Sequence, residues 1–316
     1  MPKVSVITLA YNQAPFIELN MKSIMAQTMK GYEHIILDDA STDNTLNIIK
    51  RNMDSRVRLI QHKHNAGVLM LQENYNECLK LATGEYVAML DGDDCAFPER
   101  LALSVDALRQ FEATICFGKA LIIRNNRPVG VYPQIKDTRH RTLLRRLLYE
   151  NYLASATVMF KREAIEKIGG RFQGETGATW DYLTWVMLGL TGKICFVNKI
   201  LGTYTYHGRN TSSRYDWLRI YKEAYQKYKR IDLENYGFSM NEILWHWNIN
   251  YAHKTFFYGR VALKKGMKEE ARHFFLNSLM NGDLKSRIEG ALGLLATKVP
   301  FSIEGLARFA RRNTVS

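Results

Sequence analysis

Short apolar runs alternate with segments of helical spacing over the first ninety residues, and this alternation constrains the fold more than any other feature of the sequence. The expected strands are Val4–Leu9, Tyr32–Leu37, Arg56–Gln61 and Glu85–Leu90, and the expected helices between them are 14–27, 43–52 and 68–82. Strands and helices that alternate at this spacing predict an α/β fold with a doubly wound, mostly parallel sheet.

The pattern becomes less regular beyond this point. We expect strands over 113–123, ending in an Asn125-Asn126 turn, and over 156–160; a basic loop or helix over 136–146; a helix over 179–190; and two short strands within 193–206. After about Thr211 the spacing is almost wholly helical. The sequence therefore predicts an α/β domain over residues 1–210 and a helical C-terminal region over 211–316.

The cysteines and the apolar segments indicate a compartment. Four cysteines lie far apart with no CxxC pair, as in proteins of a reducing environment. No signal-peptide pattern precedes Val4, and no window approaches 18 consecutive apolar residues. From the sequence we expect a cytoplasmic protein, either soluble or peripheral to the inner face of the membrane.

Positive charge is concentrated towards the C-terminus. Of the formal charge of +13, residues 211–316 contribute +8, with 18 Lys and Arg against 10 Asp and Glu. Such a region favours an anionic partner, either a membrane surface or a nucleic acid, or is an ordinary solvated helical surface. A helical apolar stripe runs from Ile288 to Val299, and Arg308, Arg311 and Arg312 follow it. The stripe is expected either to pack into a core or to lie on an anionic bilayer.

Carboxylates follow two of the expected strands, although the chain as a whole is basic. Asp38, Asp39 and Asp43 follow the second strand, and the segment Asp91–Asp94 follows the fourth. Ligands of an open parallel sheet bind beyond the carboxyl ends of its strands. The carboxylates of the Asp91–Asp94 segment repel one another unless a cation compensates them, and such oxygen ligands suit Mg²⁺ or Mn²⁺ bridging to a diphosphate. The alternative is a solvated acidic turn that caps the next helix.

The segment after the second strand has two interpretations as well. Ser41 or Thr42 can cap the following helix, with Asp43 stabilising its N-terminus. Capping leaves no task for Asp39, and a hydrogen-bond acceptor at that position suits the polar edge of a nucleobase.

Three ordered blocks, residues 4–12, 37–43 and 84–94, together with Pro98–Leu101, resemble family 2 inverting glycosyltransferases. The likeness covers about residues 3–210 and implies a GT-A fold. It also implies a metal-dependent transfer of sugar from a nucleotide-diphosphate sugar, with UDP favoured, to a hydroxyl acceptor. A growing cell-surface glycan or a lipid-linked oligosaccharide is the implied acceptor, and a peripheral membrane contact would suit it.

The resemblance also implies roles by position. Tyr11 would border the nucleobase and Asp39 would accept a hydrogen bond from it, with Thr8 nearby as a weaker candidate. Asp91 would lie near the donor ribose or the metal, and Asp93 would be the direct ligand of a Mg²⁺ or Mn²⁺ ion.

Inversion also requires a base that removes the proton of the acceptor hydroxyl. Asp181 matches the family's base after the stretch that begins at Gly169, although Trp180 stands where the family usually has an acid. Glu175 is the fallback, and Asp181 could instead be a simple first-turn helix acid.

The loop that follows the last expected strands carries two further candidates. His207 would contact the diphosphate or the metal, and Arg209 would pair with phosphate. Both could equally be ordinary loop residues. His62 and His64 flank a basic turn and are expected at the surface.

Two other classes of protein compete with the transferase. A nucleic-acid-binding protein could use the basic C-terminal region, and a catalytically silent scaffold could keep the fold. The basic charges are diluted by acids and no recognition motif is present, so nucleic acid is not an expected partner.

Overall fold

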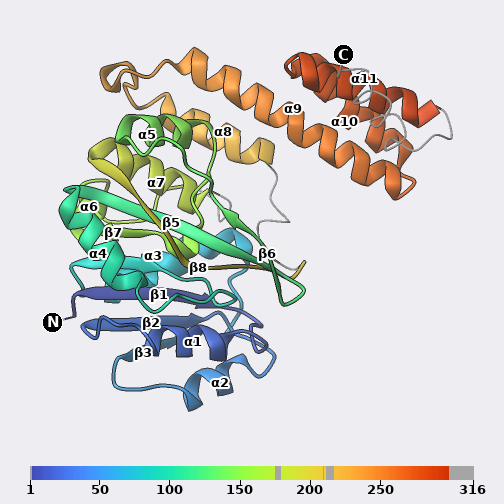
Figure 1. The fold of residues 1–316 in the computed structure, drawn as a ribbon. Coiled ribbons are helices and arrows are strands. Elements are labelled where there is room, and N and C mark those ends of the chain that lie inside the picture. Colours follow the sequence, from blue (N-terminus) through green and yellow to red (C-terminus); the bar gives the residue numbers. More distant parts are fainter. Residues whose placement is uncertain (1, 175–178, 209, 211–216, 299–316) are drawn as a thin grey trace. The chain divides into compact units, whose positions relative to one another are not determined.

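The computed structural model describes residues 2–174, 179–208, 210 and 217–298 and divides into two compact units, residues 1–229 and 230–316 (Figure 1). The strands of the first unit are β1 (Val4–Ala10), β2 (Tyr32–Asp38), β3 (Val57–Gln61), β4 (Tyr86–Met89), β5 (Ala113–Arg124), β6 (Arg127–Tyr132), β7 (Met159–Lys161) and β8 (Lys193–Tyr206). Its α-helices are α1 (Ile17–Met25), α2 (Thr45–Arg51), α3 (Leu71–Leu81), α4 (Arg100–Gln110), α5 (His140–Tyr149), α6 (Arg162–Glu166), α7 (Trp180–Thr191) and α8 (Trp217–Tyr228).

The strands form one mixed sheet in the order β3-β2-β1-β4-β7-β5-β6, with β8 beside β5. Strands β3, β2, β1 and β4 are mutually parallel, β7 is antiparallel to β4 and β5, and β8 runs parallel to β5. The doubly wound, mostly parallel sheet expected from the sequence is confirmed, and the carboxyl ends of β1, β2 and β4 meet at one edge.

Helices cover the sheet, which explains why its central strands read as apolar runs rather than as alternating patterns. Helix α1 buries Ile17, Met21 and Ile24. The connection from α3 into β4 passes so close to β1 that a Cβ on Gly84 would lie 2.6 Å from the backbone nitrogen of Ser5. Only glycine fits this crossing without moving backbone.

Two stretches differ from the sequence expectation. Residues 193–206 form one strand, β8, rather than two, because it stays paired with β5 through register shifts near Gly118 and Lys119. The turn at Asn125 and Asn126, with φ of 50° and 57°, leads back into an unpredicted strand, β6. Its tight hairpin suits two residues that tolerate positive φ.

The domain boundary falls later than the sequence suggested. Helix α8 belongs to the first unit, because Ile220 is buried there and the hydroxyl of Tyr228 donates to that of Tyr182 at 3.3 Å. The first unit thus ends at Lys229 rather than at residue 210.

The second unit is helical where it is described, with α9 (Met240–Lys264), α10 (Lys268–Asn281) and α11 (Leu284–Lys298). The ring of Phe275 fills the space between the helices, and a Cβ on Gly259 or Gly293 would meet it at 2.5 or 2.3 Å. Ile288 and Leu295 of the apolar stripe are more than half exposed. Val299 and the arginines that follow lie outside the described residues. No helix in the described ranges is long and apolar enough to cross a membrane.

Candidate active site

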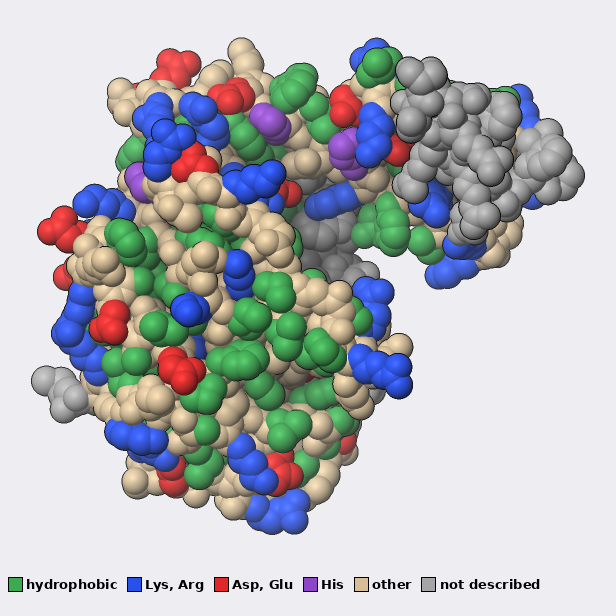
Figure 2. Space-filling view, viewed as in Figure 1, with side chains coloured by type: hydrophobic (Ala, Val, Ile, Leu, Met, Phe, Trp, Pro, Cys, Tyr) green, Lys and Arg blue, Asp and Glu red, His purple; other side chains and the backbone are tan. Residues whose placement is uncertain are grey.

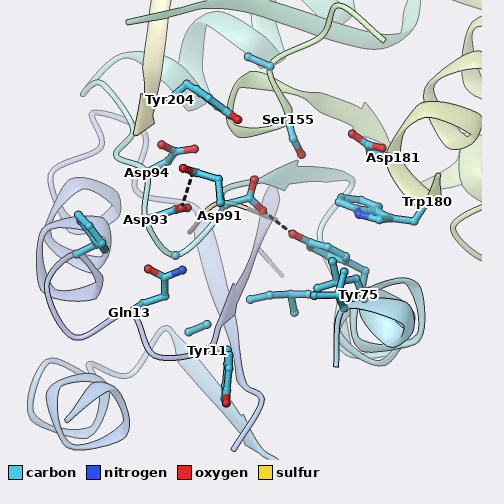
Figure 3. Close-up of a pocket in the computed structure, with 18 of the residues that line it drawn as sticks. Tyr11, Gln13, Tyr75, Asp91, Asp93, Asp94, Ser155, Trp180, Asp181 and Tyr204 are labelled. Atoms are coloured by element: carbon cyan, nitrogen blue, oxygen red, sulfur yellow. Dashed lines mark hydrogen bonds between the residues drawn. The ribbon is translucent and has the colours of Figure 1, made fainter. Parts of the chain in front are cut away.

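A cavity of about 830 Å³ opens at the carboxyl ends of β1, β2 and β4 (Figure 3). The loops after these strands line one side of it. Helix α3, the start of α7, the ends of β5, β6 and β8, and the loop over residues 151–155 supply most of the rest. The fold therefore brings together residues that are far apart in the sequence, such as Tyr11 and Asp181, which are 170 positions apart.

The acidic loop after β4 directs its three carboxylates to different partners. The hydroxyl of Tyr75 donates to Asp91 at 2.5 Å, and the backbone N–H of Thr205 donates to Asp94 at 2.7 Å. Asn20 fixes the loop by donating to the carbonyls of both aspartates at 2.8 Å. Burial, with the charge of Asp93 second, raises the pKa of Asp91 to about 6 and that of Asp94 well above its usual value.

A buried arginine lies behind this loop. Arg100 is fully buried and donates to the carbonyl of Met89. Burial lowers its pKa to about 10, so the guanidinium stays charged at neutral pH and partly offsets the charges of Asp91 and Asp94.

Asp93 pairs with His207 from the segment that follows β8. Their Oδ2 and Nε2 atoms lie 2.8 Å apart. The imidazole stacks on Phe16 at 5.0 Å between ring centres, and Asn210 holds the backbone N–H of His207 at 2.9 Å. The pair is therefore fixed from several sides.

A carboxylate and an imidazole side by side are donor groups that divalent metal ions accept. The 2.8 Å separation is that of the hydrogen bond between them, so a bound cation would take the place of the shared proton. No group of three or more His, Cys, Asp or Glu gathers at a possible metal position within the described residues. A cation held by Asp93 and His207 would therefore take its remaining ligands from substrate and water.

The loops after β1 and β2 are joined by side-chain hydrogen bonds. Asn12, at φ 54°, accepts from the backbone N–H of Thr42 at 2.8 Å, and its own N–H donates to Ser41 Oγ at 2.9 Å. The interlock leaves the neighbouring Tyr11 45% exposed on the cavity lining.

Asp39 is buried under the segment that follows β3. It accepts hydrogen bonds from His62 Nδ1 at 2.8 Å, Asn65 Nδ2 at 2.9 Å and the backbone N–H of Ala66 at 3.0 Å. Its carboxylate thus lines the cavity while shaping the 62–67 segment around it.

Asp181 lies in the first turn of α7, across the cavity from Tyr11 (Figure 3). It accepts from its neighbour's N–H, that of Tyr182, at 2.6 Å and from Asn151 Nδ2 at 2.8 Å. Burial is the main cause that raises its pKa to about 6, and the two hydrogen bonds oppose the rise. A carboxylate with such a pKa is ionised at neutral pH and remains basic enough to accept a proton.

Trp180 connects this helix to the acidic loop. Its ring stacks on Tyr75 at 3.9 Å between centres and 25° between planes, and Tyr75 in turn donates to Asp91. Trp180, which stands where an acidic residue was expected, therefore packs between the segments that carry Asp91 and Asp181.

Residues 5–169, more than half of the chain, match the family described as Glycosyl transferase family 2. The chain belongs to this family.

Proteins with similar sequences are also named as glycosyltransferases. EpsE of Bacillus subtilis is 40% identical over 125 residues, which cover 39% of this chain and 44% of EpsE. WfgD of Escherichia coli, named as a UDP-Glc:α-D-GlcNAc-diphosphoundecaprenol β-1,3-glucosyltransferase, is 26% identical over 62% of this chain and 73% of its own length.

Solved structures share the fold. S. aureus TarS 1–349 in complex with UDP-GlcNAc has a TM-score of 0.60 at 19% identity, covering 93% of this chain and 90% of its own. The mannosyltransferase PcManGT of Pyrobaculum calidifontis, in complex with GDP-Man and Mn²⁺, has a TM-score of 0.57 at 19% identity, covering 94% and 81%. The GT-A fold class with C-terminal helices is thereby confirmed.

The family 2 cavity gathers most of the residues singled out in the sequence. Tyr11, Asp39, Asp91, Asp93, Asp181 and His207 all line it. Arg209 and the fallback base Glu175 lie outside the described residues.

Thr8 is not among the residues that line the cavity. Its side chain is fully buried on β1, and its hydroxyl lies 2.9 Å from His34 Nε2. Burial lowers the pKa of His34 to about 3, so the pair is a neutral hydrogen bond of the core. The assignment of Thr8 to the binding site is therefore corrected.

His62 is partly exposed, as expected of a surface residue, but it also contacts two carboxylates. Besides Asp39 it contacts Glu77 through Nε2 at 2.9 Å. Burial lowers its pKa, but the hydrogen bonds to Glu77 and Asp39 outweigh burial and leave the pKa raised. His62 thus helps to orient Asp39.

Three residues that line the cavity were not singled out as site residues by any motif or spacing in the sequence. Asn151 and Ser155 follow α5 in a segment without a motif, and Tyr75 lies in the middle of α3, away from any strand end. Among the residues that the structure describes, the buried Oδ1 atom of Asn151 and the buried Oγ atom of Ser155 have no hydrogen-bond partner, and both residues line the cavity. Only the folded chain brings these polar atoms to the cavity.

Proposed function

We propose that this family 2 glycosyltransferase transfers a sugar from a nucleoside-diphosphate sugar, with UDP-sugars as the expected class, to an acceptor hydroxyl with inversion at the anomeric carbon. The observation that carries the proposal is that one cavity contains both the Asp93–His207 pair and the separately held carboxylate of Asp181.

The nucleotide end of the donor is assigned to the loops after β1 and β2. Tyr11 offers an exposed ring against the base, and Asp39 supplies acceptor oxygens at its edge. The complex of TarS with UDP-GlcNAc and the name of WfgD support a uridine nucleotide. Asp91 is assigned to the ribose or to the metal.

A Mg²⁺ or Mn²⁺ ion is assigned to Asp93 and His207. When bound, a divalent cation stabilises the charge of the departing diphosphate. The carboxylate and the imidazole that lie side by side support the assignment, as does the Mn²⁺ in the PcManGT complex. Arg209 is proposed to pair with the same diphosphate.

Asp181 is proposed as the base. Its carboxylate takes the proton of the acceptor hydroxyl as the oxygen bonds to the anomeric carbon and the bond from that carbon to the diphosphate breaks. The products are a new glycosidic bond and a nucleoside diphosphate. Asn151 and the N–H of Tyr182 hold the two carboxylate oxygens in place for this transfer.

The acceptor is proposed to be a growing glycan or a lipid-linked oligosaccharide at the inner face of the membrane. The undecaprenol-linked acceptor in the name of WfgD supports this, and so does the positive charge of residues 211–316. On the face shown in Figure 2, Lys and Arg are scattered among acidic and apolar side chains.

The test is release of the nucleoside diphosphate from a panel of UDP- and GDP-sugars with Mn²⁺ and with chelator. Wild-type protein should release it only with the metal, and Asp93→Asn should lose this release while keeping the melting temperature. The proposal is wrong if Asp93→Asn turns over at the wild-type rate, or if no nucleotide is released and oligonucleotides bind tightly instead.

A further inference from the structure

One wall of the cavity is built by β5, β6 and β8 and has no assigned role. Its lining residues are Ile122, Arg124, Tyr132, Tyr204 and Tyr206. Ile122 is in register with Tyr204, and Arg124 with Tyr206. Because side chains two residues apart share a face of a strand, these four lie together on one side of the sheet. We call the five residues the tyrosine wall.

Arg124 is the one Lys or Arg among the described residues that line the cavity, which also contains five aspartates. Its guanidinium carbon lies 4.6 Å from the ring centre of Tyr206. Among the described residues it has no ion pair with a carboxylate. Stacking on an aromatic face holds a guanidinium in place while its edge N–H groups point outward, a geometry that suits phosphate.

The wall lies away from the nucleotide loops. In the sheet order, β4 and β7 separate β1 and β2 from β5 and β6. Tyr11 and Asp39 follow β1 and β2, whereas Arg124 and Tyr132 are on β5 and β6. Arg124, Tyr132 and Tyr206 are also exposed, so a molecule on the wall can extend out of the cavity.

We infer that the tyrosine wall binds the phosphate-bearing end of the acceptor, with Arg124 on the phosphate and the tyrosine rings against the neighbouring sugar. The ligand class is a sugar linked through a diphosphate to a lipid. Donor and acceptor each contain a diphosphate. The donor diphosphate would bind the metal ion at Asp93, and the acceptor diphosphate would bind the guanidinium of Arg124. This inference rests on the proposed function and specifies the acceptor of the same site.

The experiment measures binding of two probes that share one sugar, an alkyl-diphospho-GlcNAc and the matching alkyl GlcNAc glycoside. Calorimetry is done with Mn²⁺ and UDP present, so that the diphosphate probe cannot occupy the donor position. Wild-type protein should prefer the diphosphate probe. Arg124→Gln should weaken that probe about tenfold, as expected for loss of a charge-assisted hydrogen bond, and leave the glycoside unchanged.

Arg127→Gln is the matched control. Arg127 is exposed on the same hairpin, opposite Arg124 in register, and does not line the cavity. The Arg127→Gln variant should bind both probes with the affinities of the wild-type protein. The inference is overturned if wild-type protein binds the two probes equally, if Arg127→Gln weakens the diphosphate probe as much, or if Arg124→Gln weakens UDP instead. Failure of the proposed function is distinguished by the release assay described above: wild-type protein would then release no nucleoside diphosphate from the sugar donors.

Discussion

Asn151 sets the proton affinity of the proposed base, and replacing it should move the pH profile of the enzyme. Its amide donates to Asp181 Oδ2 at 2.8 Å and lowers the pKa of a carboxyl group that burial has raised to about 6. Leucine has nearly the same shape but cannot donate. In Asn151→Leu the carboxylate therefore loses one of its two hydrogen bonds and becomes harder to ionise.

The size of the shift follows from the strength of that bond. A hydrogen bond to a charged group contributes about 1.5 kcal/mol or more, and one pKa unit corresponds to about 1.4 kcal/mol. The pKa should thus rise by about one unit. Since the base must be ionised to act, the acidic limb of kcat/KM moves to higher pH. At pH 6 the ionised fraction of Asp181 falls from about one half to about one tenth.

The assay is the pH dependence of kcat/KM for sugar transfer between pH 5 and 9. Ser155→Ala is the control, because Ser155 lines the same cavity without a hydrogen bond to Asp181. Its midpoint should stay at the wild-type value. A midpoint of Asn151→Leu that stays at the wild-type value or moves to lower pH would contradict the proposed effect of the Asn151 amide on Asp181.

Two further substitutions test the base and the packing of the sheet. Asp181→Asn should keep donor binding but lower transfer by about 10²–10⁴, the range of a general base, in steady-state assays; transfer at the wild-type rate would move the base elsewhere. Gly84→Ala should lower the free energy of unfolding by about 1–3 kcal/mol in denaturant titration, because its Cβ would meet the backbone of β1. Gly130→Ala, whose Cβ would meet nothing within 4 Å, should be close to neutral, and equal losses in both variants would contradict the packing argument.

The first half of the fold could be predicted because β1, β2 and β4 are buried on both faces and each is followed by a helix. The apolar runs at residues 4–9 and 32–37 therefore carried a local signal that packing did not override. The later strands carry less local signal. Strand β6 is mostly exposed at the sheet edge, and β8 keeps its pairing only through register shifts with β5, which no local pattern predicts.

Some residues of the site could likewise be predicted from the sequence, and others could not. Asp91, Asp93 and Asp39 follow predicted strands, so their meeting at one edge of the sheet was expected from topology. Thr8 was misplaced because residues in a covered strand point to either buried face, and the sequence does not say which face borders the ligand. Asn151, Ser155 and Arg124 reach the cavity from a loop and from a hairpin whose positions depend on tertiary packing.

The most direct test of the account is a crystal structure with Mn²⁺ and an unreactive nucleoside-diphosphate sugar, using anomalous scattering to locate the metal. We expect a Mn²⁺ peak within coordination distance of Asp93 and His207 and of the diphosphate, with Asp181 facing the anomeric carbon from the opposite side. A metal bound elsewhere, or an Asp181 carboxylate directed away from the sugar, would contradict it.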